Sequence, residues 1–131
     1  MNARPLQRIL YVEDEPDIRE VAALSLQAVG GFTVCLCGSG REALEQAEEF
    51  APDLILLDVM MPEMDGPATL AALRRIDALS MIPVVFMTAK AQGSEVERYR
   101  SLGAAGVIAK PFEALELPDR LSAIWRKVAW Q

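Results

Sequence analysis

Histidine is absent from this chain of 131 residues, and cysteine, aromatic side chains and positive charge are scarce. Without histidine, the chain has no Ser-His or Cys-His nucleophilic pair, no histidine metal ligand and no possible phosphohistidine donor. Its 13 Lys and Arg residues are outnumbered by 19 Asp and Glu residues, which gives a formal net charge of −6. The chain therefore lacks the basic footprint that direct binding to nucleic acid or to an anionic membrane requires.

Long apolar runs are also missing. The longest, such as Pro83–Ala89, fall far short of the ~18–20 residues that a membrane-spanning helix needs, and Met1–Gln7 lacks the apolar core of a signal peptide. Cys35 and Cys37, the only cysteines, are too close on one predicted strand to reach disulfide geometry easily. We interpret them as small core residues in a reducing cytoplasm, with a redox or metal-binding pair as the alternative.

Short apolar runs alternate with segments of helical periodicity, and no repeat or linker divides the chain. We therefore expect residues 1–131 to form a single domain, with a core of about residues 6–130. Five runs lack polar alternation, which is typical of strands buried on both faces of a parallel sheet. They are Arg8–Val12, Thr33–Cys37, Leu54–Leu57, Val84–Met87 and Val107–Ala109.

A helix is predicted after each strand. Ser39 with Glu42, and Ser94 with Glu97, have the spacing of capping boxes, while Gly103 suits the end of a helix. The alternation predicts an α/β fold with a doubly wound, five-stranded parallel sheet and right-handed crossovers. The predicted helices are Pro16–Val29, one capped by Ser39 and ending near Phe50, one from Pro67 to about Ile76, one capped by Ser94, and one from Pro118 with an apolar stripe of Leu121, Ile124, Trp125 and Val128.

Polar side chains follow four of the five strands, at the sheet edge where open α/β sheets bind ligands. Each alone is ordinary, as a helix-start acid, a turn aspartate or a solvated side chain. Together, clustered carboxylates need a cation or a protonation change to relieve their repulsion, and oxygen ligands of this kind suit Mg²⁺. With a hydroxyl and an ammonium, they point to phosphoryl transfer to an aspartate. The residues are Glu13, Asp14 and Glu15, then Asp58, Thr88 and Lys110.

With these residues at the ends of its predicted strands, the chain resembles the receiver domains of two-component response regulators, including the chemotaxis response regulators. The most specific motif is Asp58–Gly66 (DVMMPEMDG), which matches the family pattern D-x-x-M-P-x-M-D-G. Its companions, in the order the family has them, are Tyr11–Glu15 (YVEDE), Met87–Ala89 (MTA) and Ala109–Phe112 (AKPF). The resemblance covers about residues 6–130 and implies a flavodoxin-like (βα)5 sheet of strand order 2-1-3-4-5.

The resemblance also implies a role for each site residue. Asp58 would accept a phosphoryl group from the phosphohistidine of a sensor histidine kinase or a histidine phosphotransfer protein. Lys110 would contact the phosphoryl oxygens, and Thr88 would hydrogen-bond them once Asp58 is modified. The metal ligands for Mg²⁺ would be Glu13, Asp14, Asp58 and the main-chain carbonyl of Met60. Pro111 would follow a cis peptide bond that directs Lys110 into the site.

As a member of this family the chain would be a cytoplasmic signalling protein and not an enzyme, although it would promote its own phosphorylation and dephosphorylation. Its partner or dimer surface would be the face of the fourth helix, fifth strand and fifth helix, without direct contact to nucleic acid or membrane. Tyr99, Trp125 and Trp130 lie near that face. We interpret Trp125 as core and Trp130 as the better candidate for an exposed contact.

One position departs from the family pattern. The family often has Tyr or Phe three residues before the conserved lysine, and here that residue is Val107. Because valine is short and restricted at χ1, it cannot swing between inside and outside positions as a ring does. We therefore expect a response that runs through Thr88 and its loop without an aromatic rotation.

Three other functions compete with this interpretation. A haloacid-dehalogenase-type phosphatase needs a second aspartate where Met60 stands, and a dinucleotide-binding protein needs a G-x-G-x-x-G motif where Glu13–Glu15 stand. A receiver that binds partners without phosphorylation remains the alternative. The start at Met1 and the lack of a trailing linker favour a stand-alone receiver, or an N-terminal receiver trimmed after its last helix.

Overall fold

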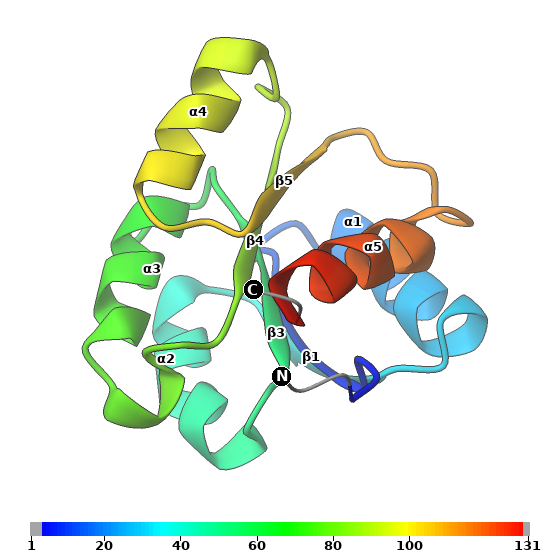
Figure 1. Ribbon diagram of the computed structural model, residues 1–131, viewed down its shortest axis with the longest axis horizontal. Helices are drawn as coiled ribbons and strands as arrows, with labels where there is room; N and C mark the ends of the chain where they lie inside the picture. Colours follow the sequence, from blue (N-terminus) through cyan, green and yellow to red (C-terminus); the bar gives the residue numbers. More distant parts are fainter. Residues whose placement is uncertain (1–3, 130–131) are drawn as a thin grey trace.

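A five-stranded parallel sheet forms the centre of the molecule, and a computed structural model describes it over residues 4–129. The strand order is β2-β1-β3-β4-β5, and helices cover both faces (Figure 1). Both features confirm the doubly wound, flavodoxin-like fold. The strands, which match the predicted runs to within one residue at either end, are β1 (Arg8–Val12), β2 (Thr33–Cys37), β3 (Leu54–Asp58), β4 (Val84–Thr88) and β5 (Gly106–Ala109).

Alternate strand residues face two separate cores. Ile9 and Tyr11 pack on the side of α1 and α5, while Leu10 and Val12 pack on the side of α2, α3 and α4 (Figure 1). Burial on both faces explains why the strands are continuously apolar. The helices are α1 (Pro16–Leu24) with η1 (Ser25–Val29), α2 (Gly40–Phe50), α3 (Gly66–Arg74), η2 (Asp77–Leu79), α4 (Gly93–Ser101) and α5 (Leu117–Ala129). Within residues 4–129, no helix is long and apolar enough to cross a membrane.

The first helix departs from the prediction of one α-helix over Pro16–Val29. The α-helix ends at Leu24, and Ser25–Val29 form a π-helical turn in which the amide of Gly30 donates to the carbonyl of Ser25. The wider turn buries Ser25 and Leu26 side by side, and the Ser25 hydroxyl donates to the carbonyl of Ala114. This tertiary bond connects η1 to the segment before α5, and helical spacing alone could not reveal it.

The residue that caps the start of α2 is the one predicted from the sequence, whereas the residue predicted to cap α4 is not. The Ser39 hydroxyl accepts from the amide of Glu42, as predicted. The prediction that Ser94 caps α4 is wrong, because α4 begins at Gly93 after the extended residue Gln92, whose carbonyl accepts from the amide of Val96. Ser94 therefore lies inside the first turn. Gly103 follows the end of α4 with a φ of +107°, as its position predicted.

Cys37 is buried and Cys35 is half-buried, and both thiols are free. Burial raises the pKa of the Cys37 thiol, which keeps it protonated and unreactive. The Cys35 thiol donates to Oε1 of Gln46, 3.1 Å away. Cys37 is thus a core residue as interpreted from the sequence, and Cys35 lies at the core margin against α2.

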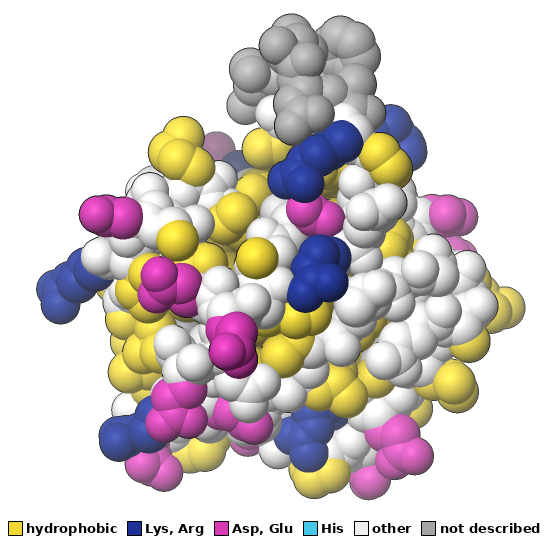
Figure 2. Space-filling model, turned by 90° about the horizontal axis from the view of Figure 1, so that it is seen from below, with side chains coloured by type: hydrophobic (Ala, Val, Ile, Leu, Met, Phe, Trp, Pro, Cys, Tyr) yellow, Lys and Arg dark blue, Asp and Glu magenta, His cyan; other side chains and the backbone are white. Residues whose placement is uncertain are grey.

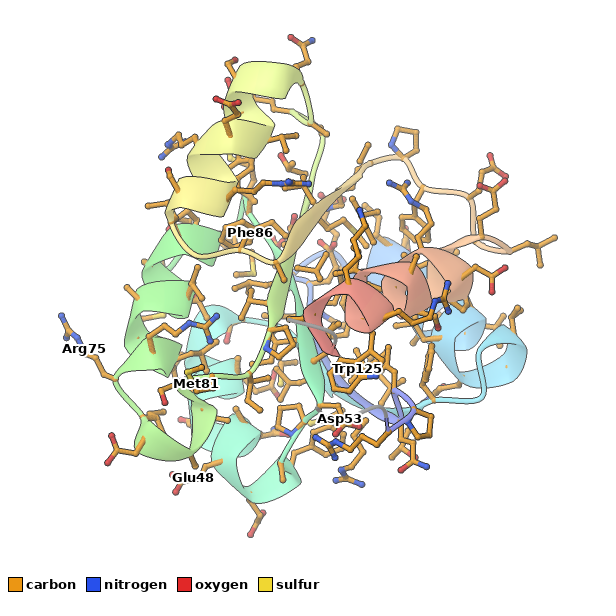
Figure 3. All side chains as sticks on the ribbon, viewed as in Figure 1. Glu48, Asp53, Arg75, Met81, Phe86 and Trp125 are labelled. Atoms are coloured by element: carbon orange, nitrogen blue, oxygen red, sulfur yellow. The ribbon has the colours of Figure 1, made fainter. Side chains whose placement is uncertain are left out.

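The opposite end of the sheet, where the strands begin, is held by Asp53. Its carboxylate accepts from the amides of Gln7 and Arg8 and pairs with the guanidinium of Arg4 at 3.0 Å. The indole of Trp125 donates to the carbonyl of Arg4, so this cluster attaches the start of the chain to α5 (Figure 3). Seen from below, the charged side chains of both signs are interspersed on this surface (Figure 2).

Candidate functional site

The predicted site residues meet at one edge of the sheet because parallel strands end together. Asp58 and Thr88 are the last residues of β3 and β4, and Asp58 lies opposite Met87 in the register of these strands. Glu13 and Asp14 follow β1, and Lys110 follows β5 with a cis peptide bond to Pro111, as predicted.

Three carboxylates form the centre of the site. Glu13, Asp14 and Asp58 each offer an oxygen within 4.8 Å of the others, and the side chains of Glu13 and Asp58 are 0% and 2% exposed. The Lys110 ammonium lies 2.9 Å from Glu13 Oε1 and 3.1 Å from Asp58 Oδ1. One ammonium cannot balance three ionised carboxylates, so the cluster favours either a proton or an additional cation.

Two oxygens of this cluster are buried without a hydrogen-bond donor within the described part of the chain: Oδ1 of Asp14 and Oδ2 of Asp58. Buried polar atoms are rarely left unpaired, and such atoms indicate a missing ion or water. Hard oxygen donors of this number and charge fit Mg²⁺, which keeps several waters and takes few protein ligands. The donor set therefore fits the predicted metal.

The same environment shifts the ionisation of the site. Burial raises the pKa of Asp58 to about 7, the Lys110 hydrogen bond opposes this rise, and the Glu13 charge adds to it. Burial by itself would lower the pKa of Lys110, but hydrogen bonds to Glu13 and Asp58 carry it above its ordinary value. Lys110 thus stays charged at neutral pH, while Asp58 competes for a proton unless a cation replaces it.

Thr88 is buried, and in this conformation its hydroxyl is hydrogen-bonded within the loop that follows β4. Oγ1 of Thr88 accepts from the amide of Lys90 at 3.0 Å. Across residues 4–129, no hydrogen bond joins Thr88 to Asp58. The structure thus brings Thr88 to the site edge without engaging the acceptor carboxylate.

The conformation of the loop after Asp58 accounts for the specific residues found in that loop. The side chain of Met60 is 68% exposed, whereas Met61 packs in the core. A Cβ atom at Gly66 would lie 2.8 Å from the Asp58 carbonyl oxygen, so only glycine lets α3 begin this close to β3. Asp65 caps α3 by accepting from the amide of Ala68. The Asp-Gly pair therefore folds the loop back over the acceptor.

Sequence reasoning missed two residues that hold Glu13. The Tyr11 hydroxyl donates to Oε1 of Glu13 at 3.4 Å, and the Arg19 guanidinium donates to its carbonyl at 2.7 Å. Gly38 leaves room for that guanidinium, since a Cβ there would lie 3.1 Å from Nη1 of Arg19. The available signal was the alternation of β1, which places Tyr11 on the same strand face as Glu13.

Near the predicted partner face, Tyr99 is core and not surface. Its ring is 3% exposed and meets the Phe86 ring edge-on at a centroid distance of 5.2 Å (Phe86 is labelled in Figure 3). Trp125 is half-buried against the α1 and α5 core, as interpreted, and Trp130 lies outside the described residues. The half-buried Val107 lies opposite Phe86 in the β4–β5 register.

A hollow of about 500 Å³ lies on this face, between β5, α5 and the end of α4. Among residues 4–129, its lining is apolar and basic, without an acidic side chain. The residues include Ala104, Val107 and Ile124 on the apolar side and Arg100, Arg120 and Lys127 on the charged side.

Comparison with known proteins agrees with this geometry. Residues 9–122 match the model of the response regulator receiver domain. The chain is 41% identical over 126 residues to the transcriptional activator protein PfeR of Pseudomonas aeruginosa, covering 95% of this chain and 39% of that protein. It is 38% identical over 121 residues to the DNA-binding response regulator MtrA of Mycolicibacterium smegmatis, covering 92% of this chain and 51% of that protein.

The chemotaxis protein CheY4 of Vibrio cholerae superposes with a TM-score of 0.84 and 29% identity, over 91% of this chain and 98% of that one. The chain thus spans about half or less of the length of these curated relatives and nearly all of a chemotaxis regulator. Since the receiver model matches most of its length, the chain belongs to the response regulator receiver domain family of two-component systems.

Proposed function

We propose that this chain accepts a phosphoryl group onto Asp58 from a phosphohistidine of a sensor histidine kinase or a histidine phosphotransfer protein. The observation that carries the proposal is the state of the Asp58 carboxylate. Oδ1 is paired with the Lys110 ammonium, whereas Oδ2 is buried, accepts no hydrogen bond from residues 4–129 and has a free lone pair to attack phosphorus.

In this reaction the bond between Asp58 and phosphorus forms as the P–N bond of the partner's phosphohistidine breaks. The electron pair of the broken bond returns to the partner's imidazole. The Lys110 ammonium contacts the phosphoryl oxygens, and the Thr88 hydroxyl hydrogen-bonds them after transfer. These groups act by charge and position, which is how phosphoryl transfer is accelerated in general.

Glu13, Asp14, Asp58 and the main-chain carbonyl of Met60 would hold Mg²⁺ beside the acceptor. When bound, the ion supplies positive charge that offsets both the carboxylates and the incoming phosphoryl oxygens. Oδ1 of Asp14, which is buried and accepts no hydrogen bond within residues 4–129, supports this assignment.

A second hollow supports a docking position for the phosphodonor. It has a volume of about 280 Å³, adjoins Lys110, and is lined by Ile18, Val21 and Phe112 together with Asp17 and Pro111. The Val21 side chain is 51% exposed. An apolar helix of the partner that packs here would bring its histidine to the edge of the sheet where Asp58 lies.

For output, we propose the face of α4, β5 and α5 as the surface for a downstream protein or a second copy of this chain. In the described part of the chain, the hollow is lined by Arg100, Arg120 and Lys127 and by no acidic side chain, so an acidic partner segment complements it. We also propose that residues 6–130 act as one receiver domain in the cytoplasm. It makes no direct contact with nucleic acid or membrane, and it promotes its own phosphorylation and dephosphorylation without acting as an enzyme on other substrates.

The test is incorporation of phosphate from a small phosphodonor such as acetyl phosphate. The wild-type chain should take up hydroxylamine-labile phosphate only with Mg²⁺, and Asp58→Asn should take up none. Arg41→Ala, an exposed change on α2, is a matched control that should behave as wild type. Uptake by Asp58→Asn at the wild-type level would refute the acceptor assignment. No uptake by wild type would instead favour a receiver that binds partners without phosphorylation.

A further inference from the structure

Tyr11 joins the α1 and α5 core to the acidic cluster. It is the fourth residue of β1 and is fully buried, and its ring packs among Ile9, Leu26 and Leu121. Glu13 comes two residues later on the same face, and the Tyr11 hydroxyl donates to its Oε1 across 3.4 Å. A single side chain thus reaches from the apolar core to a candidate metal ligand.

Packing in the core does not require the Tyr11 hydroxyl, and burying that hydroxyl costs free energy. A phenylalanine ring would fill the same space, whereas a buried hydroxyl is unfavourable unless it finds a partner. The partner is a carboxylate that is itself 0% exposed and therefore depends on protein donors. Around this carboxylate, Oε1 accepts from Tyr11 and Lys110, and Oε2 accepts from the amide of Glu15 at 3.3 Å.

Glu13 needs such support more than an aspartate would. Glutamate has one more rotatable bond, so holding its carboxylate in one place costs more conformational entropy. Lys110 also pairs with Asp58, and its ammonium cannot fix Glu13 independently. Within residues 4–129 the Tyr11 hydroxyl donates to no other acceptor, so its hydrogen bond is directed at Glu13 alone.

We propose that Tyr11 is a positioning residue for the metal-binding acids, which orients the Glu13 carboxylate toward the site through its hydroxyl. The proposal rests on the proposed function, because it concerns the same Mg²⁺ site. Tyr11 itself contacts neither phosphoryl group nor metal. Groups that hydrogen-bond a metal ligand in this way orient it and commonly tune metal affinity.

The first test compares Tyr11→Phe with Tyr99→Phe, which removes a hydroxyl from the other buried tyrosine, beside Phe86. Mg²⁺ alone is titrated into each protein, and the amide NMR signals of Asp14 and Asp58 report binding. We expect Tyr11→Phe to bind Mg²⁺ roughly threefold to tenfold more weakly than wild type, below the usual range because the hydrogen bond is long. Tyr99→Phe should keep the wild-type midpoint. Equal midpoints for the two variants would overturn the proposal.

A second measurement uses the wild-type sequence, so it does not depend on whether Tyr11→Phe folds. The chain has two tyrosines, so 3-fluorotyrosine labelling yields two ¹⁹F signals. The Tyr11 signal should shift on addition of Mg²⁺ with the same midpoint as the Asp58 amide, while the Tyr99 signal shifts less. A Tyr11 signal that ignores Mg²⁺ would refute the role of Tyr11 and leave the phosphoacceptor function intact. A wild-type chain that neither binds Mg²⁺ nor takes up phosphate would refute both proposals.

Discussion

The Lys110 ammonium lies 3.1 Å from Oδ1 of Asp58, so the residue after β5 neutralises a buried carboxylate at the end of β3. The two residues are 52 positions apart in the chain, and only the strand order brings them together. Because the Asp58 carboxylate is desolvated, this contact affects both the stability of the fold and the chemistry of the acceptor.

Replacing Lys110 with methionine should therefore destabilise the metal-free protein. Glu13 and Asp58 would lose their shared cation, and at pH 8 we expect the free energy of unfolding to fall by about 2–4 kcal/mol. The loss should shrink at pH 5, where Asp58 is protonated. Urea unfolding in EDTA measures it, with the exposed Lys127→Met as control. A loss equal at both pH values would contradict this account.

The raised pKa of Asp58 makes stability depend on pH in a defined direction. Its pKa is about 7 in the folded chain and 3.8 ordinarily, so between these values the folded state holds a proton that the unfolded state releases. The contribution of Asp58 to the free energy of unfolding therefore falls as pH rises from about 4 to about 7. In EDTA at pH 8, Asp58→Asn should be more stable than wild type by on the order of 1–3 kcal/mol.

That difference should nearly vanish at pH 4, and Mg²⁺ should reduce it at pH 8 by binding the ionised wild type. Urea unfolding at pH 4, 6 and 8, with and without Mg²⁺, gives the comparison. A constant difference between the two proteins across this range would show that Asp58 has an ordinary pKa.

Asp14 should be needed for the metal and dispensable for the fold. Oδ1 of Asp14 makes no hydrogen bond within residues 4–129, so Asp14→Ala removes no partner of that atom and relieves charge repulsion. We expect Asp14→Ala to be at least as stable as wild type in EDTA, to lose Mg²⁺ binding and to lose most phosphate uptake. Calorimetric Mg²⁺ titration and acetyl phosphate labelling test this, with exposed Glu20→Ala on α1 as control. Wild-type uptake by Asp14→Ala would exclude its metal role.

The sequence predicted the parts of the site that depend on strand order. Asp58, Thr88 and Lys110 follow recognisable apolar runs, and a parallel sheet brings such positions to one edge. It could not predict contacts that depend on how helices pack on the sheet. The bond of Arg19 to the Glu13 carbonyl and the π turn at Ser25 both arise from such packing.

The sequence also predicted the wrong first residue for α4, because the local pattern is compatible with more than one helix start. Ser94 with Glu97 has the spacing of a capping box, but the chain enters α4 in an extended conformation at Gln92 and the helix forms earlier. Tyr11 lies within the predicted strand Arg8–Val12. A strand pattern indicates on which face of the sheet a side chain lies, but it does not indicate which group the Tyr11 hydroxyl contacts. The metal role of the Met60 carbonyl remains a prediction.

The end of α2 offers a test of backbone strain away from the site. Ala51 has a φ of 55°, a left-handed conformation that glycine adopts without steric cost. Ala51→Gly should raise the free energy of unfolding by about 0.5–1 kcal/mol. Ala123→Gly on the exposed face of α5 is the control and should lower it by a similar amount. Urea unfolding distinguishes them, and destabilisation by both would refute the strain at Ala51.

Phosphorylation of Asp58 should alter the position of α4 through the Thr88 hydroxyl. Oγ1 of Thr88 accepts from the amide of Lys90, so movement of the hydroxyl toward a phosphoryl group would release that amide and displace the loop before α4. Val107 has no ring to rotate, and it packs opposite Phe86, against which Tyr99 of α4 also lies. The displacement must therefore pass through the loop at 89–94 and through α4.

Three variants separate this route from simple packing. Thr88→Ala should still accept phosphate but show much smaller NMR shift changes in α4 with a phosphate analogue such as beryllium fluoride, and Thr88→Ser should restore them because it keeps the hydroxyl. Val107→Ala should lower the free energy of unfolding by about 1–2 kcal/mol, since it removes two methyl groups from a half-buried position, and should leave the α4 response unchanged. A normal response in Thr88→Ala, or a response lost in Val107→Ala, would contradict this route, because the first would make the hydroxyl unnecessary and the second would make Val107 part of the switch.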